Sequence, residues 1–184
     1  GRPVAEFGSR RAQGSSGAIY GAKAAYIGGC AGTACTIVDR DFGIDAKGTM
    51  AHSWVQSFDN EYEAFKTYAK TYPDNCVFLV DTYNTLKSGI PNAIKVFKEC
   101  KPKNMGIRID SGDVAYLTKK ARQMLDDAGL KDCTIMVSNS LDEYLIREVL
   151  SQGACIDAFG VGERLITAKS QPVFGGVYKL AAIE

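Results

Sequence analysis

Four polar side chains capable of chemistry follow one another at an interval of 29 residues: His52, Asp81, Asp110 and Asn139. A carboxylate beside an imidazole fixes the tautomer of the ring and raises its basicity. His52 next to Asp81 could therefore act as a general base or as a nucleophile toward phosphorus. Asp110 could accept hydrogen bonds from sugar hydroxyls or hold Mg²⁺. A lone histidine is more often structural, and the shared interval is what favours a functional interpretation.

Arg108 lies two residues before Asp110, so both face the same side of an extended segment. The guanidinium fork suits a carboxylate or a phosphate. The alternative is a structural ion pair in which Arg108 and Asp110 neutralise each other. Both interpretations can hold at once.

Two other short motifs could bind an anionic ligand. Phe7 precedes Arg10 and Arg11, a combination that could hold a flat anionic ring by stacking and by charge, although it also fits a basic surface turn. Gly160 and Gly162 would let backbone N–H groups approach a phosphate, although the same pattern fits a tight turn.

The elements that must position these residues alternate along the chain. Short apolar runs predict buried strands at 46–50, 76–80, 106–109, 134–137 and 158–161. Amphipathic or small-residue patterns predict helices at 12–27, 62–69, 114–125 and 141–149, and Pro91 fits the first turn of another. Asp113, and Asn139 or Ser140, are the expected N-caps, whereas Gly129 and Gly153 are expected to end helices.

This alternation predicts a parallel α/β sheet in which the carboxyl ends of the strands meet at one face. His52, Asp81 and Asp110 should then converge on one pocket, together with Asn139. A doubly wound sheet would offer a crevice instead. A barrel places four successive strand ends around one mouth more naturally, so a barrel is the favoured architecture.

Composition excludes several classes of function. The 184 residues make one domain, and 22 basic against 21 acidic residues leave a net charge of +1, which gives no footprint for nucleic acid or an anionic membrane. The longest uncharged stretch, residues 24–38, is too short to span a bilayer. None of the six cysteines forms a CxxC motif, as expected for small buried hydrophobes in a reducing cytosol. A single histidine excludes metal sites that need two imidazoles, and the sequence carries neither a P-loop nor a GxGxxG motif after a strand.

Six segments together resemble the nicotinate phosphoribosyltransferase family: EFGSRRAQG (6–14), GTMAHS (48–53), LVDTY (79–83), GIRIDSGD (106–113), FGVG (159–162) and GGVYKL (175–180). They occur in the family's order over essentially the whole chain. The resemblance implies an irregular TIM-like α/β barrel of the type II phosphoribosyltransferases, incomplete in this chain. Residues 1–184 would be a partial barrel domain without the flanking N-terminal and C-terminal parts of the family, and are not expected to turn over substrate alone.

The resemblance also implies a reaction. Nicotinate and phosphoribosyl pyrophosphate would give nicotinate mononucleotide and pyrophosphate for NAD biosynthesis, with coupled hydrolysis of ATP through a phosphohistidine at His52 and with Mg²⁺. The family would be a cytoplasmic homodimer with no nucleic-acid or membrane partner. The catalytic residues implied are His52, Asp81 and Asp110. The substrate-binding residues implied are Phe7, Arg10, Arg11, Thr49, Arg108, Ser138, Asn139, Gly160 and Gly162, with Asp110 and Asn139 on the ribose hydroxyls and the 160–162 loop on the 5-phosphate.

Other functions remain open at this point. Nicotinamide phosphoribosyltransferases resemble the same pattern but usually carry an Asp after Gly-Thr, where this chain has Ala34, so the acid substrate is favoured over the amide. A different phosphate-binding barrel enzyme, such as an aldolase or isomerase, would need a Lys or Glu base at a strand end. A non-catalytic barrel fragment is the third alternative. The retained side chains argue against a loss of the chemistry, although not against an incomplete domain; they are His52, Asp81, Arg108 and Asp110.

Overall fold

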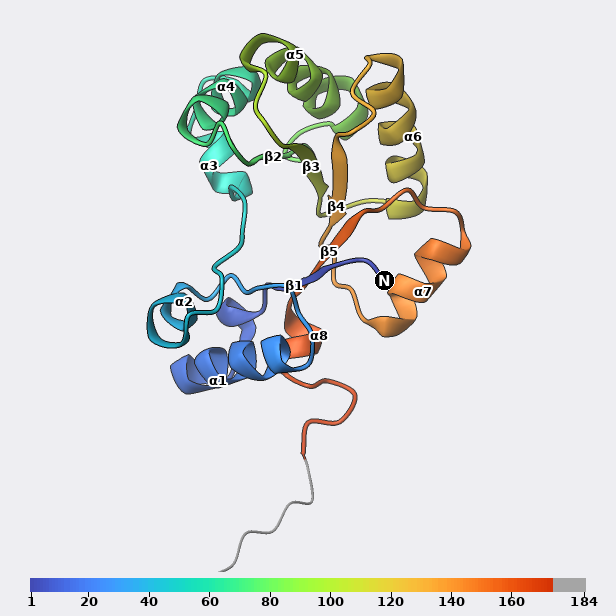
Figure 1. The fold of residues 1–184 in the computed structure, drawn as a ribbon. Helices are drawn as coiled ribbons and strands as arrows, with labels where there is room; N and C mark the ends of the chain where they lie inside the picture. The colour runs from blue at the N-terminus through green and yellow to red at the C-terminus, as the bar shows by residue number, and fades with distance from the viewer. Residues whose placement is uncertain (174–184) are drawn as a thin grey trace, which may run out of the picture.

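A curved sheet of five parallel strands lies at the centre of the computed structural model, which describes residues 1–173 (Figure 1). The strands are β1 (Val4–Glu6), β2 (Cys76–Leu79), β3 (Met105–Ile109), β4 (Thr134–Val137) and β5 (Ala158–Val161). Their order across the sheet is β1-β5-β4-β3-β2, and every pairing is parallel. Two single-residue bridges, from Glu6 to Thr33 and from Thr33 to Ala46, continue the parallel arrangement beyond β1.

Helices cover the convex side of this sheet and its β1 end. They are α1 (Gly14–Ile27), α2 (Thr36–Phe42), α3 (His52–Gln56), α4 (Glu61–Thr71), α5 (Ile90–Cys100), α6 (Val114–Asp127), α7 (Glu143–Ser151) and α8 (Glu163–Ile166), with a 3-10 turn η1 (Ser9–Arg11) and a π-helical turn η2 (Thr85–Gly89). Figure 1 shows α4 to α7 around the outside of the strands, and α1, α2 and α8 gathered near β1. Within residues 1–173, none of these helices is both long and apolar enough to cross a bilayer.

Successive side chains of each strand point to opposite faces of the sheet, and one face is packed against helices while the other is open. Phe78 of β2 points toward the helices, where its ring stacks between Phe65 of α4 and Phe97 of α5, at 4.6 Å from each. The opposite, concave face carries Val77 and Met136, which line a cavity of ≈ 420 Å³ together with residues 45–49. The helices therefore stabilise one face of the sheet, and the other remains available for a binding site.

Local signals account for most of the helix ends. Asp113 caps α6 by accepting a hydrogen bond from the backbone N–H of Tyr116, as expected. Gly129 and Gly153 adopt φ values of 82° and 77° directly after α6 and α7, which favours glycine there. The expected cap of α7 at Asn139 or Ser140 is wrong. Asp142 caps that helix instead, because its carboxylate accepts from the Leu145 N–H.

The parallel α/β architecture is confirmed, but the described residues do not close it into a barrel. The predicted strand at 46–50 is wrong: only Ala46 makes a bridge, and the chain from Gly48 to Ala51 passes the open side of the sheet without a backbone ladder to any strand of residues 1–173. A closed ring needs ladder pairing on both sides of every strand, and β2 pairs only with β3 within this part of the chain. The GGVYKL segment at 175–180 lies outside the described residues.

Candidate functional site

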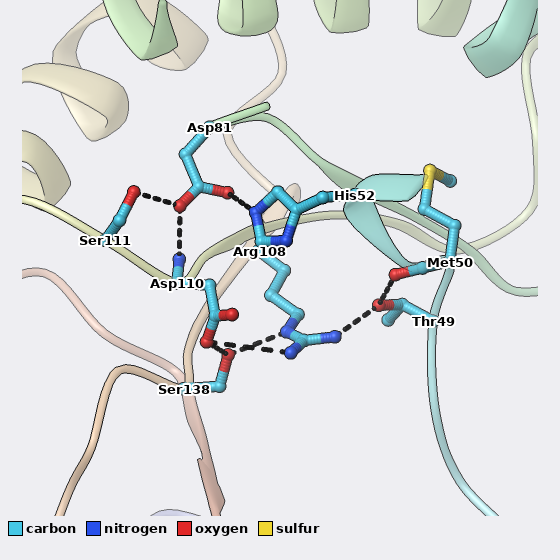
Figure 2. A network of polar contacts seen from close by, with 8 residues as sticks. All are labelled: Thr49, Met50, His52, Asp81, Arg108, Asp110, Ser111 and Ser138. Atoms are coloured by element: carbon cyan, nitrogen blue, oxygen red, sulfur yellow. Dashed lines mark hydrogen bonds and ion pairs between the residues drawn. The ribbon is translucent and has the colours of Figure 1, made fainter. Parts of the chain in front are cut away.

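The imidazole of His52 and the carboxylate of Asp81 are joined by a hydrogen bond at the end of β2 (Figure 2). His52 Nε2 lies 3.0 Å from Asp81 Oδ1, and because a carboxylate only accepts, Nε2 is the donor. The second oxygen of Asp81 accepts from the backbone N–H of Asp110 at 3.0 Å and from Ser111 Oγ at 2.5 Å. Only 1% of the Asp81 side chain is exposed, against 39% for His52. Asp81 is therefore a fixed orienting group, and His52 lines the cavity described below with a ring whose Nδ1 has no hydrogen-bond partner within residues 1–173.

Arg108 connects three segments of the site. Its Nε donates to Ser138 Oγ at 2.7 Å and its Nη1 donates to Thr49 Oγ1 at 2.9 Å. Ser138 Oγ in turn donates to Asp110 Oδ1 at 2.7 Å, which lies 3.7 Å from Arg108 Nη2. The predicted ion pair of Arg108 with Asp110 is confirmed (Figure 2), and Arg108 also lines the cavity at which the sequence predicts an anionic ligand. Burial lowers the pKa of Arg108, and the neighbouring charges of Asp110 and Asp81 oppose that change.

An aromatic ring covers one side of this network. The guanidinium carbon of Arg108 lies 5.1 Å from the centre of the Phe7 ring. Gly160 lies beneath the same ring, so close that a Cβ at this position would sit 2.5 Å from a ring carbon. The strand that leads to Phe7 is fixed by the fully buried Glu6, which accepts from Thr33 Oγ1 at 2.5 Å and from the Gly8 N–H. A planar ligand could therefore meet an aromatic face and a cation at one place.

Two cavities meet at this network. The larger, of ≈ 540 Å³, is the His52 cavity; it is lined by Phe7, Ser9, Arg10, Ala34, residues 48–53, Leu79, Arg108 and Asp110. The smaller, of ≈ 250 Å³, is the Ser138 cavity; it is lined by Phe7, Arg10, Arg11, Arg108, Asp110, residues 138–140, Gly162 and Glu163. Because Phe7, Arg10 and Arg108 line both, the two cavities form one site with two compartments.

The structure brings together nearly all of the residues predicted from the sequence. His52, Asp81, Arg108 and Asp110 belong to one hydrogen-bonded network, and Asn139 lines the adjoining cavity. The predicted substrate residues Thr49 and Ser138 are members of the network, and Arg10 and Gly162 line the cavities.

Two of the predicted residues lie less centrally. Arg11 is more than half exposed, and its guanidinium lies 3.7 Å from a carboxylate oxygen of Glu163. Gly160 lies beneath Phe7 and is not among the residues that line either cavity.

Two supporting residues were not predicted. Ser111 donates to Asp81, and its position directly after Asp110 at a strand end was the available signal. Glu6 anchors the start of the Phe7 segment, and a carboxylate between apolar residues of a short strand was the signal there. The contacts of Ser111 with Asp81 and of Glu6 with Thr33 do not follow from local sequence, because each joins residues that are close only in the fold.

The donor set within residues 1–173 does not form a protein-held metal centre. No group of three or more His, Cys, Asp or Glu side chains in this part of the chain is arranged to hold an ion. Asp110 and Glu163 are the carboxylates that line the two cavities; Asp110 accepts a hydrogen bond from Ser138 Oγ, and Glu163 lies 3.7 Å from the Arg11 guanidinium. Mg²⁺ is commonly bound through one or two carboxylates plus substrate phosphates, so these residues fit an ion that arrives with a phosphorylated ligand.

Comparisons with known proteins agree with this architecture. The model of the nicotinate phosphoribosyltransferase (NAPRTase) family matches residues 3–184. The nicotinate phosphoribosyltransferase of Bacillus subtilis (strain 168) is 54% identical over 181 residues, which are 97% of this chain and 37% of the relative. The nicotinate phosphoribosyltransferase pncB2 of Mycobacterium tuberculosis (strain H37Rv) is 42% identical over 186 residues, which are 100% of this chain and 40% of the relative. The chain thus spans about two fifths of the length of these relatives.

Solved structures share the fold. Human nicotinic acid phosphoribosyltransferase superposes with a TM-score of 0.78 at 24% identity, over 88% of this chain and 44% of that chain. The nicotinate-nucleotide pyrophosphorylase of Pyrococcus furiosus superposes with a TM-score of 0.75 at 27% identity, over 91% of this chain and 43% of that chain. The arrangement of strands and helices described above is therefore shared with longer proteins.

Proposed function

Because the chain belongs to the nicotinate phosphoribosyltransferase family, we propose that it carries the centre at which nicotinate reacts with phosphoribosyl pyrophosphate. The products are nicotinate mononucleotide and pyrophosphate, in the synthesis of NAD. The observation that carries this proposal is the single network that joins His52 and Asp81 to the Arg108 guanidinium at the wall of a cavity. Nicotinate is a flat ring with one negative charge, which suits the Phe7 face and the cations beside it.

In this proposal Phe7 and Arg108 hold the pyridine ring, and Arg10 completes the grip on its carboxylate. Alignment of the ring nitrogen with the ribose carbon replaces a bimolecular encounter by a fixed geometry. Departure of pyrophosphate leaves positive charge on the ribose, and Asp110 is the carboxylate near enough to both cavities to stabilise it. Asn139 would bind a ribose hydroxyl, and the backbone near Gly162 would bind the 5-phosphate.

We further propose that His52 accepts a phosphoryl group from ATP. Since Nε2 donates to Asp81, the lone pair on Nδ1 is the nucleophile. The bond from phosphorus to the ADP oxygen breaks as the bond to Nδ1 forms, and ADP leaves with the electron pair. Asp81 then stabilises the ring while it carries positive charge. Mg²⁺ would accompany the nucleotide and the diphosphate as part of the substrates and neutralise their charge.

Incubation of the complete protein with labelled ATP tests this assignment. We expect an acid-labile, alkali-stable phosphate that mass spectrometry places on His52, and none in His52→Ala. Ser53→Ala is the matched control, because Ser53 lines the same cavity and its hydroxyl would form an acid-stable ester instead. His52→Ala should retain slow phosphoribosyl transfer without stimulation by ATP. Equal stimulation of His52→Ala and the parent would contradict the proposal.

The uncharged Ala34 in the His52 cavity favours the acid over the amide substrate. An aspartate at this position would repel a carboxylate and accept from an amide. Comparison of kcat/KM for nicotinate and nicotinamide in the parent and in Ala34→Asp decides between these substrates.

The complete barrel, the homodimer and the cytoplasmic location that the resemblance implies belong to this proposal as well. We propose that turnover requires the complete protein, because this chain spans about two fifths of its relatives.

A further inference from the structure

A buried carboxyl group lies in the layer behind Asp81. Glu61 is the first residue of α4 and is only 3% exposed. Its Oε2 accepts from Ser88 Oγ at 2.6 Å and from Asn92 Nδ2 at 3.3 Å. Its Oε1 is buried and has no hydrogen-bond partner within residues 1–173, and the same holds for Thr82 Oγ1, next to Asp81. Glutamate is almost never fully buried unless paired, so this placement calls for an explanation.

The residues that Glu61 holds lead directly to the end of β2. Ser88 belongs to the π-helical turn η2, a rare conformation that is frequent at functional sites. Gly89, the next residue, packs against Val80, the residue that follows β2: a Cβ there would be 1.8 Å from the Val80 carbonyl oxygen. Val80 immediately precedes Asp81. Glu61 thus fixes η2 from one side while the other side of η2 rests on the backbone that carries Asp81.

Packing alone does not account for a carboxyl group at this place. Burial raises the pKa of Glu61, hydrogen bonds from Ser88 and Asn92 oppose this change, and the charge of Asp81 raises the pKa further. An apolar side chain of similar volume would avoid the cost of desolvation and often stabilises a fold as well or better. The polar contacts to Ser88 of η2 and to Asn92 of α5 therefore select one conformation of η2 and of the first turn of α5 rather than add stability in general.

We propose that Glu61 is a positioning residue for the reaction: by holding Ser88 of η2 and Asn92 of α5 it fixes η2 against the end of β2 and keeps the Asp81 carboxylate aligned with His52 Nε2. The inference rests on the proposed function only where kcat and KM are measured; the His52 resonance does not depend on it. Glu61 touches neither substrate nor His52, so its effect passes through the orientation of Asp81.

The experiment compares Glu61→Ala with Glu61→Gln in the complete protein. Glutamine can still accept from Ser88 and Asn92, whereas alanine cannot. Ala69→Gly on the same helix is the matched control, since it weakens α4 without touching a polar group. The first readout is the downfield proton resonance of His52 Nε2, which is visible when a hydrogen bond protects it from exchange with water; its absence in His52→Ala assigns it. The second readout is the separation of kcat from KM for both substrates.

We expect Glu61→Ala to lose the His52 Nε2 resonance. Its kcat should fall about ten-fold, which is in the range known for groups that orient a ligating imidazole. The KM of each substrate should change less than about two-fold. Glu61→Gln and Ala69→Gly should keep both properties. A folded Glu61→Ala that retains the resonance overturns the proposal. A Glu61→Gln that behaves like Glu61→Ala also overturns it, because the charge of the carboxylate would then matter rather than the position that it gives to Ser88 and Asn92.

A failure of Glu61→Ala to fold does not end the test. Ser88→Ala leaves α4 and its buried carboxyl in place and removes the contact between Glu61 and η2, so it should lose the same resonance; retention again overturns the proposal. The resonance is measured without substrate. If the parent shows no phosphate on His52, the proposed ATP coupling fails, and the comparison of resonances still decides the role of Glu61.

Discussion

The contact between Gly160 and Phe7 allows a quantitative test of how the aromatic face is held. A Cβ added at Gly160 would lie 2.5 Å and 2.6 Å from two carbons of the Phe7 ring and 3.0 Å from Ser138 Cβ. Carbon atoms in contact lie about 3.5–4.0 Å apart, so Gly160→Ala must displace the ring by about 1 Å. The backbone cannot yield easily, because Gly160 is paired with Ala5 in the β5–β1 ladder.

Two measurable effects follow from that displacement. Overpacking of this kind costs about 1–3 kcal/mol, which urea unfolding of the complete protein measures. A misplacement of about 1 Å at a substrate-positioning group can reduce the rate about 10²-fold, so we expect kcat/KM for nicotinate to fall by roughly that factor. Gly17→Ala is the matched control, because its Cβ would meet only atoms 3.8 Å and 3.9 Å away.

A double-mutant cycle separates the clash from any other effect of the methyl group. In a Phe7→Ala background the ring is gone, so Gly160→Ala should cost far less in unfolding free energy than it does in the parent. An equal cost in both backgrounds would refute the reasoning, since the strain would then arise somewhere other than at Phe7. An unchanged kcat/KM in a destabilised Gly160→Ala would refute the role given to the ring.

Two further predictions follow from buried titratable groups. Burial raises the pKa of Cys76 and of Cys133 to about 12. Iodoacetamide at about pH 8 should therefore label the partly exposed Cys100 and Cys155 in the native protein and leave Cys76 and Cys133 unmodified. Peptide mapping measures the labelling, and early modification of Cys76 would contradict the burial described. The pKa of Glu61 is raised above its ordinary value of 4.5 mainly by burial, so the folded state binds this proton more tightly than the unfolded state and its stabilising effect is lost as the pH rises through the folded pKa. The urea midpoint of Glu61→Gln should therefore rise relative to the parent as the pH increases above 4.5, and a relative fall would show the opposite linkage.

The sequence predicts β2 to β5 well because each is an apolar run bounded by turns, and helical patterns follow β3 and β4. β1 was missed because it has only three residues, and one of them is the buried Glu6, so no apolar run marks it. Its place in the sheet comes from pairing with β5, more than 150 residues away. Such a contact leaves no local trace in a sequence.

The prediction that His52 lies beside Asp81 is confirmed, and the prediction of the element that carries it is wrong. The sequence places it after a strand, whereas it begins α3, and residues 48–51 make no ladder with any strand of the described chain. Two side-chain contacts join this segment to the sheet instead: His52 to Asp81 and Thr49 to Arg108. The interval of 29 residues therefore predicts correctly that His52 and Asp81 lie close together. They meet through their side chains, and the predicted strand at 46–50 plays no part in this.

This mode of attachment has a consequence for the chemistry. In a paired strand, backbone hydrogen bonds would hold a terminal histidine in place independently of the contacts of its side chain. Here cavities lie on both sides of residues 48–51, and the imidazole is located by the packing of the buried Met50 and by the same carboxylate that sets its proton. Orientation of Asp81 thus controls both where His52 lies and which ring nitrogen is free, so groups that hold Asp81 from behind can influence the reaction without touching the substrate.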